Sequence, residues 1–326
     1  MKFFRIVFTL ACVVMSAVVA PQLANAQAWP SKPVRVIVTF APGGSSDVVA
    51  RLISGPLQQK LGQTVIVDNK PGGGGTIGAA EAARAAADGY TFLLSNSAPI
   101  SISPFMLDKA PYDPVKSFNH VAYIGSVANV FVLHPSVSAK SIKELIVWAK
   151  AQKEPINYGS GGIGSIGHII GEVFKNENKL AIEHIGYKGS TPMHTDLIGG
   201  RLKFAIDTLP QNVPYMQDGR LRAIAVTSPK RAGISPDVPT VIEAGQPKLV
   251  AENFLGLSSP AGIAPDVASR FHAVMAEILA DPDIIKKLEN LGVYGRKMSV
   301  AEFNAFVSKQ VTDWAPLVKA SGAKLN

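Results

Sequence analysis

The architecture is set by residues 34–47, which read Val34-Arg35-Val36-Ile37-Val38-Thr39-Phe40-Ala41-Pro42-Gly43-Gly44-Ser45-Ser46-Asp47. The first half is a run rich in β-branched residues, which is typical of a buried strand, and proline and glycine then break the run. Residues 48–60 follow with apolar side chains at helical spacing. A strand, a glycine loop and a helix in this order form the repeating unit of a parallel sheet covered by helices.

The same unit recurs along the chain. Predicted strands cover residues 64–68, 90–95, 121–127, 130–133, 156–158, 182–187, 204–207 and 221–227. Predicted helices cover residues 76–87, 141–151, 166–175, 265–279, 284–291 and 300–321. Ser141, followed by Glu144, has the pattern of a capping box at a helix start. The last helical segment has no second sheet of its own, so we expect it to return and pack on the first lobe.

The length and this alternation indicate an α/β protein of two lobes. A chain of 326 residues is large for one core and suits two domains of ordinary size. We expect two doubly wound lobes, with residues 27–128 and 252–326 in the first and residues 129–251 in the second. Crossing segments near Asn129 and Phe254 would form a hinge, with a cleft between the lobes.

The first 26 residues have the pattern of a secretory signal. Lys2 and Arg5 precede an uncharged, largely apolar run at residues 6–19, and Ala24-Asn25-Ala26 is the small-x-small pattern that signal peptidase reads. The run is shorter than the roughly 20 apolar residues of a membrane-spanning helix. We therefore expect export from the cytoplasm with cleavage after Ala26, or alternatively after Ala28.

Cys12, the single cysteine, lies inside that apolar run. The mature chain therefore has no cysteine for a disulfide, a nucleophile or a metal site. The formal net charge of +8 becomes about +6 on cleavage, because two cations are lost. A modest positive excess suits an anionic ligand or an anionic membrane surface. Its even spread, without a cluster of Lys and Arg, argues against nucleic-acid binding.

Three glycine loops, at residues 41–47, 71–75 and 159–165, each follow a predicted strand and precede a predicted helix. At a helix start the backbone N–H groups lack intrahelical partners and the helix dipole is positive, so carboxylate or phosphate binds there. For any single loop, the alternative to ligand binding is that its glycines only allow a tight turn. The first and third loops also carry serines in separate lobes, which favours binding. For the middle loop we favour lining of the cleft over a packing role.

Several side chains lie at the carboxyl ends of predicted strands, where parallel sheets usually bind ligands. Asn96 and Ser97 follow the third strand. Asp207 ends another strand, where it would accept a hydrogen bond from a ligand or cap the next helix. Phe40 directly precedes the first loop and is predicted to form a pocket wall that excludes water from the hydrogen bonds of the cleft.

The sequence does not indicate an enzyme active site. Residues 162–167 match the dinucleotide-binding pattern, with Glu183 near the expected acidic position, but a nucleotide cofactor is hard to supply outside the cytoplasm. No G-x-S-x-G nucleophile elbow occurs. None of the six histidines has H-x-x-x-H or H-E-x-x-H spacing, so His168 is interpreted as a packing or cleft-facing residue. We expect no catalysis, no cofactor and no metal.

Four stretches together carry a resemblance to a known family. They are residues 40–47, Asn69-Lys70-Pro71-Gly72-Gly73-Gly74-Gly75-Thr76-Ile77-Gly78-Ala79, Tyr187-Lys188-Gly189-Ser190-Thr191-Pro192 and Asp237-Val238-Pro239-Thr240-Val241-Ile242-Glu243-Ala244-Gly245. From about Trp29 onward the chain resembles the Bug family, the substrate-binding receptors of tripartite tricarboxylate transporters. The resemblance implies a type II periplasmic-binding-protein fold, whose lobes close by a hinge on a carboxylate, partly through ordered water.

The resemblance also implies a function. We predict a periplasmic solute-binding receptor that captures a dicarboxylate, an aromatic acid or an amino acid and delivers it to a large and a small membrane subunit. We expect a monomer. A binding domain that signals to a membrane sensor kinase is the first alternative, and a nucleotide-dependent enzyme is the second.

Carried over by position, the two binding loops correspond to residues 42–47 and 160–165, and Asp207 falls where some family members contact a ligand amino group. The predicted ligand-binding residues are Phe40, Pro42, Gly43, Gly44, Ser45, Ser46, Asp47, Thr76, Asn96, Ser97, Ser160, Gly161, Gly162, Ile163, Gly164, Ser165, His168, Gly189, Ser190 and Asp207.

Overall fold

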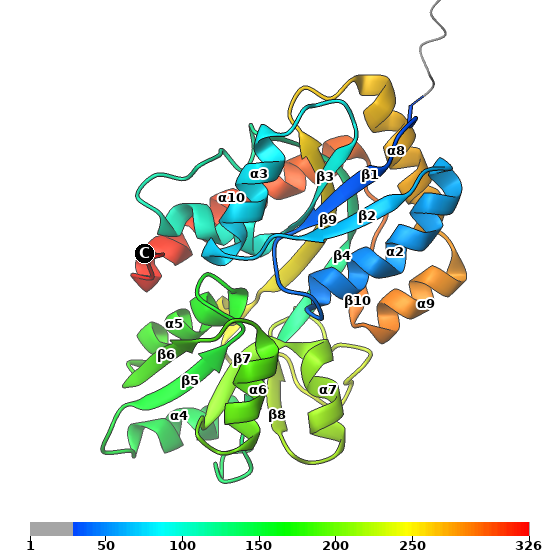
Figure 1. Cartoon of the computed structure of the whole chain (residues 1–326). Coiled ribbons are helices and arrows are strands. Elements are labelled where there is room, and N and C mark those ends of the chain that lie inside the picture. The colour runs from blue at the N-terminus through cyan, green and yellow to red at the C-terminus, as the bar shows by residue number, and fades with distance from the viewer. Residues whose placement is uncertain (1–28, 326) are drawn as a thin grey trace, which may run out of the picture.

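The computed structural model describes residues 29–325, so the predicted signal segment and its cleavage site lie outside the described residues. The described chain folds into two lobes of strands and helices that are joined by two long strands (Figure 1). The predicted α/β class with two lobes is confirmed. Within these residues, no helix combines the length and the apolar character needed to cross a membrane.

The sheet of the first lobe contains, in spatial order, β2 (Val65–Asn69), β1 (Val34–Val38), β3 (Thr91–Asn96), β9 (Glu252–Pro260) and the first part of β4 (Phe118–Leu133). β1 pairs in parallel with β2 and β3, whereas β9 is antiparallel to β3 and β4. The two-residue strand β10 (Val293–Tyr294) also pairs with β4. The glycine loop that follows β1 therefore lies at the carboxyl edge of the parallel strands.

Helices cover both faces of this sheet. One face packs against α2 (Ser45–Leu61), α8 (Pro265–Ile278) and α9 (Pro282–Asn290), and the other packs against α3 (Thr76–Arg84) and the first half of α10 (Val300–Ser321). The β1 side chains alternate between the two cores, because Val36 joins the first and Ile37 the second. Burial on both faces explains why this strand is continuously apolar.

The second lobe repeats the design with a smaller sheet. Its strands are β5 (Ile156–Ser160), β6 (Ile182–Gly186), β7 (Phe204–Thr208), β8 (Arg222–Val226) and the end of β4, with β5 parallel to both β6 and β7. One face packs against α4 (Ile142–Lys150) and α5 (Ile166–Asn178), and the other packs against α6 (Ser190–Ile198) and α7 (Leu209–Gln217). Each lobe thus has its own double-sided core.

Two strands connect the lobes. β4 pairs with β9 as far as Ala128 and with β7 from Asn129 onward, so a single 16-residue strand belongs to both sheets. β9 enters the first lobe at Glu252. Asn129 therefore lies where β4 passes from one sheet to the other, and Phe254 lies on β9, two residues after that strand begins.

Some predicted elements were wrong in extent. The strands predicted at residues 121–127 and 130–133 form one strand, because pairing with β9 continues through Ala128 and pairing with β7 begins at Asn129. β9 was not predicted as a strand, since Gly256, Ser258 and Ser259 have low strand propensity, yet it is buried between β3 and β4. The helix predicted at residues 48–60 begins earlier, at Ser45, so the serines after the first glycine loop form the first helical turn.

Candidate ligand-binding cleft

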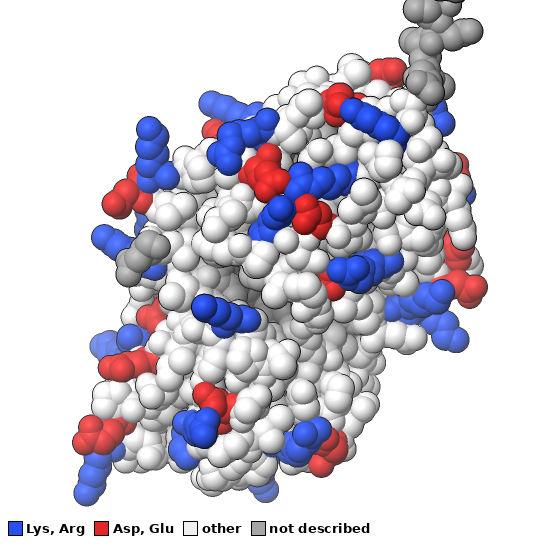
Figure 2. Space-filling model, viewed as in Figure 1, with Lys and Arg blue, Asp and Glu red and all other residues white. Residues whose placement is uncertain are grey.

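A cavity of about 950 Å³ lies between the two lobes. Its volume is in the range of small-molecule binding sites. Figure 2 shows the hollow between the lobes, with a largely uncharged surface inside and charges of both signs spread over the rest of this face. The cleft predicted between the lobes is therefore present.

Five helix starts converge on this cavity. The first lobe contributes the N-terminal ends of α2 and α3, and the second contributes those of α5, α6 and α7. Each start presents N–H groups without intrahelical partners and the positive end of a helix dipole. The residues of these starts that line the cavity are Gly44, Ser45, Ser46, Gly75, Ser165, Ile166, Gly167, Gly189, Ser190, Thr191, Pro192, Thr208 and Gln211. The cavity is therefore surrounded by partial positive charge.

The first glycine loop is held in place by a buried carboxylate. Asp47 is 3% exposed and accepts hydrogen bonds from the Gly43 N–H (3.0 Å), the Asn69 Nδ2 (3.0 Å) and the Arg51 Nε (3.0 Å). Burial alone would raise the pKa of Asp47, but the hydrogen bonds from Arg51, Gly43 and Asn69 hold it below its usual value. Gly43 has a φ of 84°, which favours glycine. The loop geometry is thus fixed by contacts within the first lobe.

The loop before α5 rests on a stack of two histidines. The rings of His168 and His184 lie parallel with centroids 3.8 Å apart. The Gly164 N–H donates to His168 Nδ1 (3.2 Å), and the Ser160 hydroxyl lies 2.7 Å from His184 Nε2. Ser165 caps α5, since its hydroxyl accepts from the His168 N–H (3.2 Å). Neutral imidazoles therefore support the loop from behind.

We expect acid to weaken this support. Burial lowers the pKa of His168 to about 4 and that of His184 to about 3, and burial lowers that of His120 to about 4. Because the unfolded chain binds protons near pH 6.5 and the folded chain does not, the free energy of unfolding should fall as the pH falls from 6.5 toward 4. Urea unfolding at pH 7 and at pH 5 would measure the loss.

Imidazole NMR titration provides the control for this prediction. The ring signals of His168 and His184 should remain those of the neutral form at pH 5.5. Midpoints near the ordinary histidine value of 6.5 would show that the stacked pair does not resist protonation, and the account of the loop support would be wrong.

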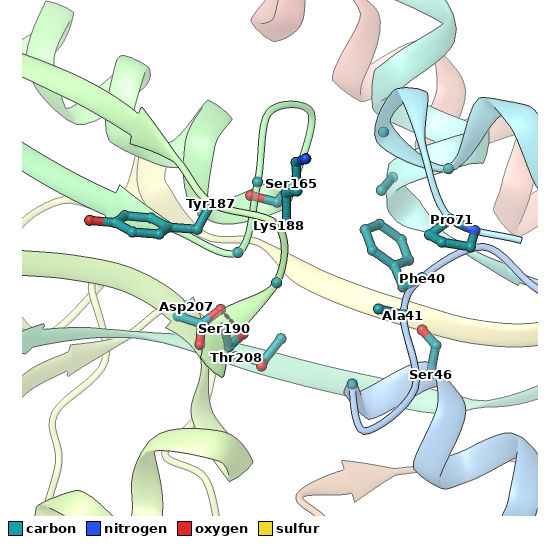
Figure 3. Close-up of a pocket in the computed structure, with 18 of the residues that line it drawn as sticks. Phe40, Ala41, Ser46, Pro71, Ser165, Tyr187, Lys188, Ser190, Asp207 and Thr208 are labelled. Carbon is teal, nitrogen blue, oxygen red and sulfur yellow. Dashed lines mark hydrogen bonds between the residues drawn. The ribbon is translucent and has the colours of Figure 1, made fainter. Parts of the chain in front are cut away.

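A second buried carboxylate lies in the wall of the second lobe. Asp207 is 4% exposed and lines the cavity, where it accepts from the Ser190 hydroxyl (2.9 Å) and the Asn212 Nδ2 (3.3 Å). His194 Nε2 lies 3.6 Å from its Oδ2. Burial raises the pKa of Asp207, and His194 opposes this effect. Figure 3 shows Asp207 beside Ser190 and Thr208, facing the first lobe across the gap.

Among residues 29–325, three charged residues line the cavity, namely Lys188, Asp207 and Lys324. Neither lysine pairs with a carboxylate of another described residue. Lys188 lies beside Ser165 at the edge of the gap, opposite Phe40, whereas Tyr187 points away from the gap (Figure 3). The Tyr187 hydroxyl instead donates to Asp196 (2.8 Å). The balance of side-chain charge in the cleft is therefore positive.

Most of the predicted site residues lie in the cavity wall. They come from both lobes, and they are Phe40, Pro42, Gly43, Gly44, Ser45, Ser46, Asn96, Gly161, Gly162, Ile163, Ser165, Gly189, Ser190 and Asp207. The middle glycine loop, with Pro71 and Gly72 to Gly75, lines the cavity as well. Phe40 turns its ring toward the second lobe (Figure 3).

The other predicted residues lie behind the wall. They are Asp47, Thr76, Ser97, Ser160, Gly164 and His168, and each contacts a loop or strand that the cavity wall contains. The Thr76 hydroxyl, for example, donates to the Gly73 carbonyl (2.7 Å), and the Ser97 hydroxyl accepts from the Phe254 N–H of β9 (3.1 Å). The structure places these six as supports of the wall.

Several lining residues were missed by the sequence reasoning. They are Ala41, Ala98, Asn129, Ile166, Gly167, Gly186, Tyr187, Lys188, Thr191, Pro192, Thr208, Gln211, Asn253, Lys324 and Leu325. The Tyr187-Lys188-Gly189 motif was a usable signal, since it lies in a stretch already noted. Asn129 and Asn253 lie on the connecting strands, and no local pattern places them in a cleft. Among residues 29–325, no group of His, Cys, Asp or Glu is arranged to hold a metal ion.

A family model described as the tripartite tricarboxylate transporter family receptor matches residues 49–323. The chain belongs to this receptor family. Among its Bug relatives, BugT of Bordetella pertussis (strain Tohama I) is 34% identical over 302 residues, which cover 92% of this chain and 93% of BugT. The predicted membership of the Bug receptors is confirmed.

Two solved structures support the fold of this Bug receptor. One is described as a periplasmic transporter; it is 38% identical, with a TM-score of 0.86, and the match covers 92% of this chain and 100% of the other. The other is R. palustris Rpa4515 with adipate, which is 31% identical, with a TM-score of 0.85, over 91% of this chain and 99% of the other. The type II periplasmic-binding-protein fold is confirmed.

Proposed function

We propose that this Bug receptor binds a small carboxylate between its lobes and presents it to a membrane transporter. The observation that carries the proposal is the convergence of five helix starts on one cavity, with loops from both lobes. Backbone N–H groups at helix starts bind carboxylates without a charged side chain. The relative with adipate supports a dicarboxylate ligand, and aromatic acids and amino acids are the further candidates.

A buried amide supports the proposal independently. Asn129 is 3% exposed and lines the cavity at the connecting strand β4. Its Nδ2 is one of two buried side-chain polar atoms in residues 29–325 that lack a hydrogen-bond partner. A buried donor without a partner costs about 1–3 kcal/mol. A ligand oxygen or a bridging water would satisfy this amide at the base of the cleft.

We place the receptor in the periplasm after cleavage near Ala26, with the lobes divided at residues 128/129 and 251/252. Hinge closure on the ligand would be the signal read by the large and small transporter subunits. We propose a monomer that binds its ligand and does not transform it.

A thermal-shift panel tests the proposal. The mature chain would be heated with adipate, succinate, malate, citrate, benzoate, nicotinate and glutamate, with NAD and glucose as controls. A ligand that binds only the folded state raises Tm, and the shift grows with the ratio of the ligand concentration to its Kd. We expect a shift with at least one class of carboxylate. A shift with NAD alone would favour the nucleotide-dependent enzyme, and no shift with any carboxylate would contradict the proposal.

A further inference from the structure

The C-terminal helix belongs to both lobes. In the first half of α10, Phe303 and Val307 are buried in the core of the first lobe. In the second half, Trp314 and Val318 are buried in the core that contains α5 of the second lobe. The end of α10 therefore lies at the boundary between the lobes (Figure 1).

The residues after α10 turn back toward the cleft and are held there. Gly322 ends the helix with a φ of 68°, a left-handed conformation that reverses the chain. The Ala323 N–H donates to the Ser321 hydroxyl (3.2 Å), which tightens the turn. The Leu325 N–H then donates to the Met106 carbonyl of the first lobe (3.0 Å). We call residues 322–325 the C-terminal tail.

The tail forms part of the cavity wall. Leu325 is half-buried against the core beside Met106, and its Cδ1 lies next to Gly74 of the middle glycine loop, at 3.3 Å from the Cβ position there. Lys324 and Leu325 both line the cavity. Because the anchored Leu325 fixes the backbone of its neighbour, Lys324 is kept at the cavity wall, from which its side chain can reach a negative group on a ligand.

We propose that Lys324 is a specificity-determining residue that favours ligands with a second anionic group. The inference rests on the proposed carboxylate function and extends it. Helix starts would bind one carboxylate through neutral donors, and Lys324 would add full positive charge for the second. An exposed ion pair is worth modest energy, and exclusion of water on closure increases it.

The test compares acids that differ only in the second carboxylate. Isothermal titration would give Kd for adipate against hexanoate, and for succinate against butyrate, with the full mature chain. We expect Lys324→Gln to weaken dicarboxylate binding by about three- to tenfold and to change monocarboxylate binding less than about twofold. Lys324→Arg should keep the preference, and Leu325→Asn should lose it, because the tail is released.

Lys319→Gln is the matched control. Lys319 is an exposed lysine in the last turn of α10 that does not line the cavity. Its replacement by glutamine therefore removes the same charge from a nearby position and leaves the cleft unchanged. If Lys324→Gln and Lys319→Gln act alike, or if the dicarboxylate affinity is unchanged, Lys324 has no such role. If the wild type binds neither member of either pair while other carboxylates in the panel bind, the proposed role of Lys324 in binding these dicarboxylates is contradicted. If no carboxylate binds at all, the proposed function fails first.

Discussion

Gly44→Leu is expected to abolish carboxylate binding and to leave the fold in place. Gly44 precedes α2 and lines the cavity, with φ −74° and ψ 163°, a conformation that leucine adopts without strain. A Cβ at this position would meet only the Ala41 carbonyl oxygen, at 3.5 Å, which is ordinary contact. The leucine side chain would therefore extend into open space within the cleft. We expect affinity to fall about 100-fold or more, and stability to change by about 1 kcal/mol or less.

Gly55→Leu is the matched control for this variant. Gly55 lies within the same helix, away from the cavity, and a Cβ there would meet nothing within 4 Å. Titration of both variants with the best carboxylate, together with their melting temperatures, gives the comparison. Wild-type affinity in Gly44→Leu would show that the start of α2 is not part of the binding site.

Gly167→Ala is expected to destabilise the second lobe by about 3 kcal/mol or more. A Cβ at Gly167 would lie 1.9 Å from the carbonyl oxygen of Ile206 and 2.9 Å from its carbonyl carbon. Both atoms belong to the backbone of β7, so no side-chain rotation relieves the clash. α5 would have to move away from the sheet, and its N-terminal loop would move with it.

Urea unfolding followed by circular dichroism would measure the loss, with an explicit check for separate transitions of the two lobes. Gly55→Ala should be neutral or slightly stabilising, because it removes a helix glycine without any clash. An unchanged unfolding midpoint in Gly167→Ala would contradict the close approach of α5 to β7. The glycine pattern at residues 162–167 is explained by this packing and by the turn, without a nucleotide.

The extent to which the sequence predicted this structure depends on the range of the contacts involved. Strand, glycine loop and helix are neighbours in sequence, so the position of Gly43, Gly44 and Ser165 at helix starts could be predicted from local pattern. The pairing of β9 between β3 and β4 could not, because residues 252–260 contain glycine and serine and are strand only through burial by distant strands.

Contacts between residues that are distant in the sequence also limit the prediction of the cleft. The predicted Ser160 and His168 flank the loop before α5. They lie behind this loop, because Ser160 donates to the Gly162 carbonyl and His168 accepts from the Gly164 N–H. Lys324 lines the cavity although Asn253, the lining residue that precedes it in the sequence, is more than 70 residues away. No periodicity in the C-terminal sequence indicates that the chain returns to the cleft after α10.

The most direct test of the central claim is a crystal structure of the mature protein with the carboxylate that gives the largest thermal shift. The account predicts density for one ligand between the lobes, with carboxylate oxygens within hydrogen-bond distance of the backbone N–H groups at the starts of α2 and α5. Ligand density outside this cleft, or a ligand in the cleft without contacts to either helix start, would contradict it.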